Sequence, residues 1–334
     1  MGSNEASDGG EQKPRRHLKV VGLSKSRYTV GLQCHRRLWW TVHEREAPEL
    51  VVGPELQAVF DQGHEVGEAA QGQFPGGTLI DLPPWKLRER VEATRAALDA
   101  GATVIYEASF MVGDVFVAVD VLHRAPGRRG WTITEVKSTL SVKDEHIPDA
   151  AVQAHVVRAA GLPVSRVEIM HLNGECRFPD LSNLFVLSDV TDGVKAALEA
   201  VPPEIAAQLG VLGRETPPEV APGPHCTDPR ECPFLGRCWP PAPEHSIHTL
   251  HGGAKKRAAF AEQGFATILD LPDDAALNGA ADRQHRAVKA GGTVVDPGLA
   301  DALSVLKAPI AHLDFETISP AIPVWPGCSP HRGV

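Results

Sequence analysis

The stretch that decides the fold is residues 115–137, VFVAVDVLHRAPGRRGWTITEVK. Two runs of β-branched and aromatic residues, 115–122 and 131–136, flank a segment with Gly and Pro turn signals, and this order predicts a β-hairpin. With its turn near Gly127-Arg128, residues whose numbers sum to about 255 face each other, which pairs Asp120 with Glu135. Lys137 lies two residues beyond Glu135 and shares its face of the strand.

The pattern around this hairpin predicts an α/β (α+β) fold with a mixed sheet flanked by helices. Further strands are expected at 103–110 and 166–172, and helices at 28–40, 55–72, 86–100 and 147–160. The domains expected from composition are a disordered leader (1–19), a core (20–201), a Pro-rich linker or loosely packed arm with a cysteine cluster (202–245), a helical region (246–306) and the start of a further domain (307–334), which opens on a strand at 311–318.

Composition restricts the function only weakly. The chain has 334 residues, and its net charge of −9 argues mildly against a nucleic-acid partner. Residues 12–43, however, contain Lys and Arg but no acid, and this block either contacts phosphates or forms a solvated tail. No apolar run approaches a membrane span and no signal peptide is present, so we expect no membrane contact and a cytoplasmic location.

Two carboxylates on facing strands can share a divalent cation through their oxygens. An ammonium beside them can orient a water or stabilise the charge that develops when a phosphodiester is cut. A Glu-x-Lys triplet alone is common on exposed strands. Asp120 in register with Glu135, and Gln153 on the following helix, favour an active site over a solvated strand edge.

Cysteines form a second candidate site. Cys226, Cys232 and Cys238 are separated by five residues each, and Cys34 lies near the start of the chain. Zinc sites mostly use gaps of two to four residues, whereas longer gaps suit a bulkier iron–sulfur cluster. The alternative is four unrelated reduced thiols, as we expect for Cys176 and Cys328.

Together these motifs resemble the RecB-like nucleases of the PD-(D/E)xK fold. More closely, the chain is similar to bacterial RecB-like proteins related to the CRISPR-associated exonucleases that carry an iron–sulfur cluster. The matching segments are LSKSR (23–27), QCHRR (33–37), YEASF (106–110), EVKS (135–138), HLN (171–173) and CPF (232–234). The resemblance implies a restriction-endonuclease-like sheet and a helical, cysteine-bearing arm.

The resemblance also implies residue roles. Asp120, Glu135 and His64 would hold Mg²⁺ or Mn²⁺, and Lys137 and Gln153 would complete the catalytic set. Cys34, Cys226, Cys232 and Cys238 would hold a structural 4Fe–4S cluster. Relatives often have Tyr shortly after the helix glutamine, whereas Ala154-His155-Val156 follows Gln153 here, so a DNA contact at that position is not carried over.

Other acidic residues receive weaker interpretations. Glu107 is either a supporting carboxylate or a satisfied core acid, and Asp149 and Glu145 are read as solvated or capping residues. Asp314 and Glu316 resemble the first motif of DEDD-type exonucleases, in a domain that stops before its other acidic motifs. Residues 250–265 predict either a helical pair that offers amides to phosphate or a plain helical pair.

The functional expectation is a metal-dependent deoxyribonuclease, an exonuclease on single-stranded DNA or DNA ends. A helicase, repair or CRISPR-type partner stays unidentified. The rival interpretation is a non-catalytic nucleic-acid-binding module stapled by zinc or an iron–sulfur cluster.

Overall fold

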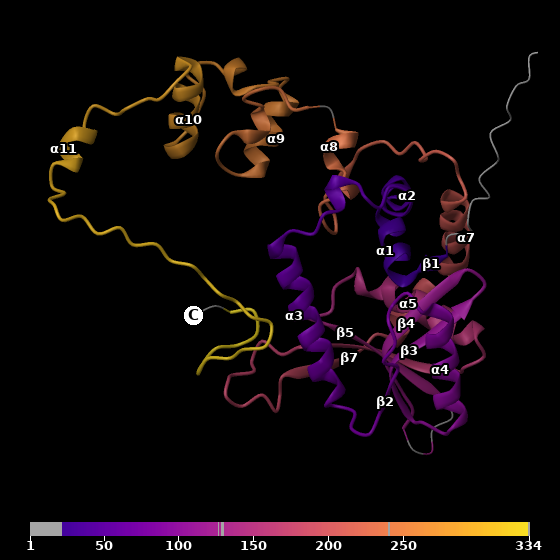
Figure 1. The fold of residues 1–334 in the computed structure, drawn as a ribbon. Helices are drawn as coiled ribbons and strands as arrows, with labels where there is room; N and C mark the ends of the chain where they lie inside the picture. Colours follow the sequence, from indigo (N-terminus) through magenta and orange to yellow (C-terminus); the bar gives the residue numbers. More distant parts are fainter. Residues whose placement is uncertain (1–21, 126, 128–129, 240, 333–334) are drawn as a thin grey trace, which may run out of the picture. The chain divides into compact units, whose positions relative to one another are not determined.

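The computed structural model describes residues 22–125, 127, 130–239 and 241–332, and it divides into two units (Figure 1). The first unit holds the residues up to Pro233 together with those from Thr317 onward, and the second is Phe234–Glu316. The expected 1–19 leader, and Lys13, Arg15, Arg16 and Lys19 of the basic block, lie outside the described residues.

The first unit is built on a seven-stranded mixed sheet flanked by helices, as the hairpin pattern predicts (Figure 1). The strand order is β2-β3-β4-β5-β6-β7, with β1 paired to β4. The strands are β1 (Leu23–Ser24), β2 (Thr78–Leu79), β3 (Val104–Val112), β4 (Val115–His123), β5 (Trp131–Lys137), β6 (Val164–Leu172) and β7 (Phe185–Asp189). The expected meander is β3, β4 and β5, and both of its pairings are antiparallel.

Eleven α-helices occur in the described residues. They are α1 (Lys25–Gln33), α2 (His35–His43), α3 (Pro54–Gln71), α4 (Leu87–Asp99), α5 (His146–Ala159), α6 (Thr191–Ala197), α7 (Val201–Leu212), α8 (Leu235–Cys238), α9 (Ala254–Glu262), α10 (Gly279–Ala290) and α11 (Leu299–Leu303). The helices expected at 55–72, 86–100 and 147–160 are confirmed as α3, α4 and α5.

The helix expected over 28–40 is broken in two at Cys34. Cys34 adopts an extended backbone (φ −164°, ψ 121°) and separates α1 from α2. At the other end of α1, the Ser24 hydroxyl accepts a hydrogen bond from the Arg27 amide (3.3 Å) and caps the helix. The break places a cysteine at a bend of the chain rather than on a continuous helix face.

The linker or loosely packed arm expected at 202–245 is wrong over its first quarter, which forms α7. Pro202 and Pro203 suggested a linker, but they occupy the first turn of this helix, where proline costs no hydrogen bond. Ile205 and Leu212 are buried and belong to the main core. Residues 201–212 are therefore an integral helix of the first unit.

Helix α5 is the most deeply buried helix of the first unit. Ala150, Val152, Ala154 and Val157 are all fully buried, together with the polar Gln153. They pack in one core with strand residues such as Ile133 and Ile169. Small and β-branched side chains on every side let α5 approach the sheet closely, so any polar group it carries toward β5 is held away from water.

The second unit contains α8 to α11 and a small core of its own, formed by Ile247, Leu250, Ile268, Leu271 and Ala281. Within the described residues the strand expected at 311–318 is absent, and Asp314 and Phe315 are exposed. A strand needs a neighbour to take its backbone hydrogen bonds, and this segment has none in the described part of the chain. From Thr317 the chain rejoins the first unit, where the Ala321 amide donates to Gln62 (2.8 Å).

Two helix glycines test how closely α1 packs against α7 in the first unit. A Cβ on Gly31 of α1 would lie 2.3 Å from Cδ of the buried Gln208, whereas a Cβ on Gly63 of α3 would meet nothing within 4 Å. We expect Gly31→Ala to lower the free energy of unfolding by about 1–3 kcal/mol through overpacking. Gly63→Ala should raise it by about 0.5–1 kcal/mol through reduced backbone entropy. Urea unfolding of both variants checks this, and equal effects at the two sites would contradict the close α1–α7 approach.

Candidate active site

The candidate site lies where strands β4 and β5 part. Their ladder pairs Val121 with Thr134, so the register sums to 255 as the hairpin predicts. At the next position the Asp120 carboxylate, rather than a backbone carbonyl, accepts the Val136 amide (Oδ2, 2.7 Å). Because β3 pairs with β4 from Val115 to His123 except at Asp120, β1 and β5 share the other edge of β4, and Asp120 lies between them.

Glu135 is the centre of the site. Its side chain is only 3% exposed, and both of its oxygens are engaged. Oε1 accepts from Lys25 Nζ (2.9 Å) and Lys137 Nζ (2.7 Å), and Oε2 accepts from Lys25 Nζ (3.0 Å) and Gln153 Nε2 (2.7 Å). Lys25 Nζ also lies 4.0 Å from Asp120 Oδ1. A buried carboxylate requires such partners to remain charged.

Helix α5 supplies the remaining groups. Asp149 and Gln153 are four residues apart and so lie on one helix face. Asp149 Oδ2 pairs with Lys137 Nζ at 2.5 Å, and the Asp149 carbonyl accepts from Gln153 Nε2. The interpretation of Asp149 as a solvated or capping residue is therefore wrong, because its carboxylate is buried against Lys137. Glu145 is the residue before α5, but its side chain makes no capping hydrogen bond.

The three carboxylates have pKa values shifted in different directions, because burial and repulsion raise a pKa whereas nearby ammonium groups lower it. Burial and the charge of Glu135 raise the pKa of Asp120 to about 7, against the opposing charge of Lys25. Burial would likewise raise the pKa of Glu135, but Lys25 and Lys137 outweigh it and hold that pKa well below its ordinary value. Burial and the charge of Glu135 also raise the pKa of Asp149.

The two ammonium groups stay charged. Burial alone would lower the pKa of Lys25 and Lys137, but the facing carboxylates outweigh it and raise both pKa values well above the ordinary range. Lys137 therefore acts at this site as a fixed positive charge and a hydrogen-bond donor, and it does not act as a base near neutral pH.

Glu107 lies on β3 opposite Asp120, at a step missing from the β3–β4 ladder, and has φ +58°. Its carboxylate accepts from Arg90 Nη2 (3.0 Å). Its charge still contributes to the raised pKa of Asp120. Of the two interpretations of Glu107, the supporting carboxylate fits best, because its side chain is 42% exposed and ion-paired rather than in the core. Its positive φ is a strained backbone conformation for a residue other than glycine.

His64 is not brought into the carboxylate cluster. It is exposed on α3, and among the described residues no hydrogen bond or ion pair joins it to Asp120 or Glu135. Within the same residues, no three His, Cys, Asp or Glu side chains form a ready-made metal site. At Asp120 and Glu135 the space between the carboxylates is occupied by Lys25 Nζ.

Three of the four candidate cluster cysteines belong to the first unit. Gln33 donates its amide to the carbonyls of His225 (2.8 Å) and Arg230 (2.6 Å), which fastens the end of α1 to the loop that carries Cys226 and Cys232. Within that loop the Cys232 amide donates to the Cys226 carbonyl (2.8 Å), and the Gly223 amide donates to Cys226 Sγ (3.5 Å). Cys238 belongs to the second unit, so its part in a cluster stays a prediction.

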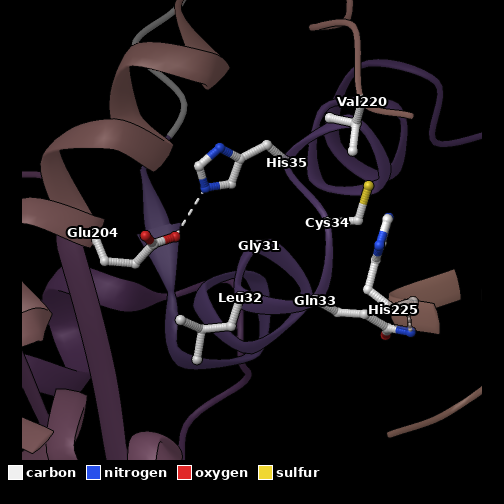
Figure 2. Close-up of a pocket in the computed structure, with 8 residues that line it drawn as sticks. All are labelled: Gly31, Leu32, Gln33, Cys34, His35, Glu204, Val220 and His225. Carbon is white, nitrogen blue, oxygen red and sulfur yellow. Dashed lines mark hydrogen bonds and ion pairs between the residues drawn. The ribbon is translucent and has the colours of Figure 1, made fainter. Parts of the chain in front are cut away.

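Figure 2 shows the cavity of about 270 Å³ beside Cys34. Cys34 and His225 lie on one side of it, and the His35–Glu204 pair (2.9 Å) lies on the other. Asp120 and Glu135 do not line this cavity. Cys34 and His225 do, so the cavity lies beside the candidate cluster cysteines.

The guanidinium of Arg37 interacts electrostatically with both Cys34 and Cys232. Burial lowers the pKa of Arg37, while negative charge on Cys232 and Cys34 would raise it. Its Nη1 donates to Gln33, and its buried Nε–H has no partner among the described residues. A buried donor without a partner beside two thiols is a place for an anionic sulfur acceptor.

Comparison with known proteins adds little. No family model matches the chain, and no curated protein matches it. One solved structure, described as "Crystal structure of SSO0001", matches 59% of this chain and 79% of its own, at 10% identity and a TM-score of 0.27. A match this loose carries no argument about fold or function. In the described part of the chain, no helix is both long and apolar enough to cross a membrane.

Two members of the site were not identified from the sequence. Lys25 lies in the basic block and in the matching segment 23–27 but is given no role there, and Asp149 is interpreted as a solvated or capping residue. A signal for Asp149 was available, because it lies four residues before Gln153 on a helix without a polar face. The segment 23–27 marks the neighbourhood of Lys25 but not its contact with Glu135. The role of Lys25 depends on the pairing of β1 with β4, which brings together segments about 90 residues apart.

His146 provides a pH test of the site's surroundings. It is buried at the start of α5, its Nδ1 accepts from the Lys143 amide (3.2 Å), and burial and the charge of Lys137 lower its pKa to about 4. A histidine with a lowered pKa adds stability above its unfolded pKa, and this stability is lost as pH falls through about 4. His146→Asn keeps an acceptor but cannot titrate. The wild type should lose on the order of 2 kcal/mol relative to the variant between pH 7 and 4. Urea unfolding at several pH values measures this, and a constant difference would contradict it.

Proposed function

We propose that the protein is a metal-dependent DNA nuclease of the RecB-like PD-(D/E)xK type, acting in the cytoplasm. The observation that carries the proposal is the convergence of Asp120, Glu135 and Lys137 at the point where β4 and β5 part. A carboxylate pair from adjacent strands and an ammonium on the same short segment are what hydrolysis of a phosphodiester needs.

The donor set fits a hard divalent cation such as Mg²⁺ or Mn²⁺. Burial and the charge of Glu135 raise the pKa values of Asp120 and Asp149, so the cluster favours further positive charge, which a bound cation would supply in place of protons. Asp149 Oδ1 and Gln153 Oε1 are buried acceptors without a partner in the described residues. Oxygen ligands of this kind suit Mg²⁺ and Mn²⁺. When bound, the cation would polarise a phosphoryl oxygen and acidify a water.

The chain's own residues have distinct tasks. Asp120 and Glu135 would hold the cation, and Gln153 would orient Glu135 through its amide. Lys137 stays protonated, so it would orient the attacking water and stabilise the negative charge of the transition state. His64 is a ligand only as implied by the family resemblance, since no hydrogen bond or ion pair joins it to Asp120 or Glu135 among the described residues.

The cysteine region is proposed to hold a structural 4Fe–4S cluster through Cys34, Cys226, Cys232 and Cys238. The amide that points at Cys226 Sγ and the unpartnered Arg37 Nε–H support this, because N–H donors stabilise the negative charge of a cluster. Such a cluster would fasten the α1–α2 bend to a loop 192 residues away in sequence, counted from Cys34 to Cys226.

The proposed substrate is DNA, single-stranded or at duplex ends, and any helicase, repair or CRISPR-type partner is unidentified. The described half of the basic block is largely used in internal contacts. Lys25 pairs with Glu135, Arg27 donates to the Gly22 carbonyl, and Arg36 donates to the Pro218 carbonyl. Phosphate contacts from this block would therefore come mainly from Lys13, Arg15, Arg16 and Lys19.

Lys137→Ala tests the catalytic assignment. Because Lys137 acts mainly on the transition state, its removal should lower kcat by about 100-fold or more while DNA binding changes little. The assay is Mg²⁺- or Mn²⁺-dependent cleavage of labelled single-stranded, duplex and end-blocked DNA.

Asp314→Ala is the matched control, since it removes a carboxylate of the second acidic motif, which is exposed and outside any strand. Its activity should equal that of the wild type. If Asp314→Ala abolished cleavage and Lys137→Ala did not, the assignment would be wrong. DNA binding without any cleavage by the wild type would favour the non-catalytic binding module.

Anaerobic purification tests the cluster. We expect a brown protein that contains iron and acid-labile sulfide, and we expect Cys232→Ser to lose the colour and lower the yield of folded protein. Cys176→Ser, at a buried cysteine outside the pattern, should keep the iron. Stoichiometric zinc without iron would overturn the iron–sulfur assignment and leave a zinc staple in its place.

A further inference from the structure

We propose that Lys25 is a built-in competitor of the divalent cation, so that metal binds to Asp120 and Glu135 only by displacing the Lys25 ammonium. The inference rests on the proposed function and concerns the regulation of the same site. It is argued from the position of Lys25 Nζ, from the element that carries the side chain, and from the charges around it.

The position of Nζ is that of a bridging cation. It lies 2.9 and 3.0 Å from the two oxygens of Glu135 and 4.0 Å from Asp120 Oδ1. A metal ion shared by these two carboxylates needs the same space and the same lone pairs. Both cations cannot occupy it together, because the ammonium already uses lone pairs of both Glu135 oxygens that the metal ion would need.

The backbone delivers Lys25 to this place and leaves its side chain free to move. Ser24 pairs with Phe116 in the β1–β4 ladder and caps α1, so the first residue of the helix is fixed beside Asp120. The Lys25 side chain is 21% exposed and that of Asp120 is 27% exposed, so neither side chain is sealed from solvent. A lysine stem of four carbons can swing outward without any change in the backbone.

Helix stability does not explain a lysine at this position. Lys25 is the first residue of α1, where the helix dipole disfavours positive charge. Its favourable interactions are with the carboxylates of the site. Lys137 does not fill the same role, because it is also held by Asp149 and can keep that pair when a metal enters.

The test measures metal binding by the full-length protein without DNA. Lys25→Met removes the charge and keeps the length of the side chain. Isothermal titration with Mn²⁺ and with Mg²⁺ should show an affinity about tenfold or more above that of the wild type, because the charged hydrogen bonds that metal must break are gone. Lys143→Met is the control, since Lys143 is an exposed lysine with no ion pair to Asp120 or Glu135 in the described structure. It should change the affinity less than twofold by the loss of one screened charge.

A second measurement covers the case in which Lys25→Met does not fold without metal. In wild-type protein labelled at lysine ¹³Cε, the Lys25 resonance should shift saturably as Mg²⁺ is added, while the Lys143 resonance should not. Asp120→Asn should abolish the shift. An unchanged Lys25 resonance at saturating Mg²⁺, or a Lys25→Met affinity equal to or below that of Lys143→Met, would overturn the competition.

These outcomes separate the inference from the proposed function. If the wild type cleaves DNA and Lys25→Met gains no metal affinity, the nuclease stands and the competition falls. If no DNA is cleaved but Lys25→Met binds Mn²⁺ more tightly, the competition stands and the nuclease falls. If neither protein binds metal, both are overturned.

Discussion

The buried carboxylate of Glu135 is the constraint on which the rest of the site depends. A carboxylate with a side chain 3% exposed keeps its charge only when every lone pair has a partner, and here Lys25, Lys137 and Gln153 provide them. These three groups come from α1, β5 and α5. The charge of one residue therefore fixes how a helix N-terminus, a strand and a buried helix meet.

That requirement also explains the local departure from regular sheet. Strand β4 changes partner on one edge, from β1 at Phe116 to β5 at Val121, and Asp120 lies in the interval. A side chain replaces the backbone acceptor at Val136, which lets the strands part while the Val136 amide keeps a hydrogen bond. Asp120 and Glu135, two carboxylates from adjacent strands, lie at the opening so made, and this is where the proposed cation would bind. The function proposed for the chain thus depends on an interruption of the fold.

The sequence predicts the parts of this arrangement that depend on local pattern. The β-branched and aromatic runs at 115–122 and 131–136, with the turn signals at 123–130 between them, predict the hairpin and its register, and therefore the closeness of Asp120 and Glu135. What it does not predict are contacts made across the chain. Strand β1, which pairs with β4, is only two residues long and therefore has no periodicity to recognise. Helix α7 was not predicted because Pro202 and Pro203, which usually indicate a linker, lie in its first turn. The strand expected near Asp314 shows the opposite error, an apolar pattern without a neighbouring strand to bond with.

Helix α1 links the two candidate inorganic sites. It begins with Lys25 at the carboxylates and ends at Gln33, which fastens it to the cysteine loop and is followed by Cys34. Nine helical residues span about 13 Å and behave as one rigid piece. Whatever orders Cys34, Cys226 and Cys232 therefore also orders the end of α1 that carries Lys25. A cluster at the cysteines would then lie at one end of the helix whose other end carries the ammonium proposed to compete for the metal.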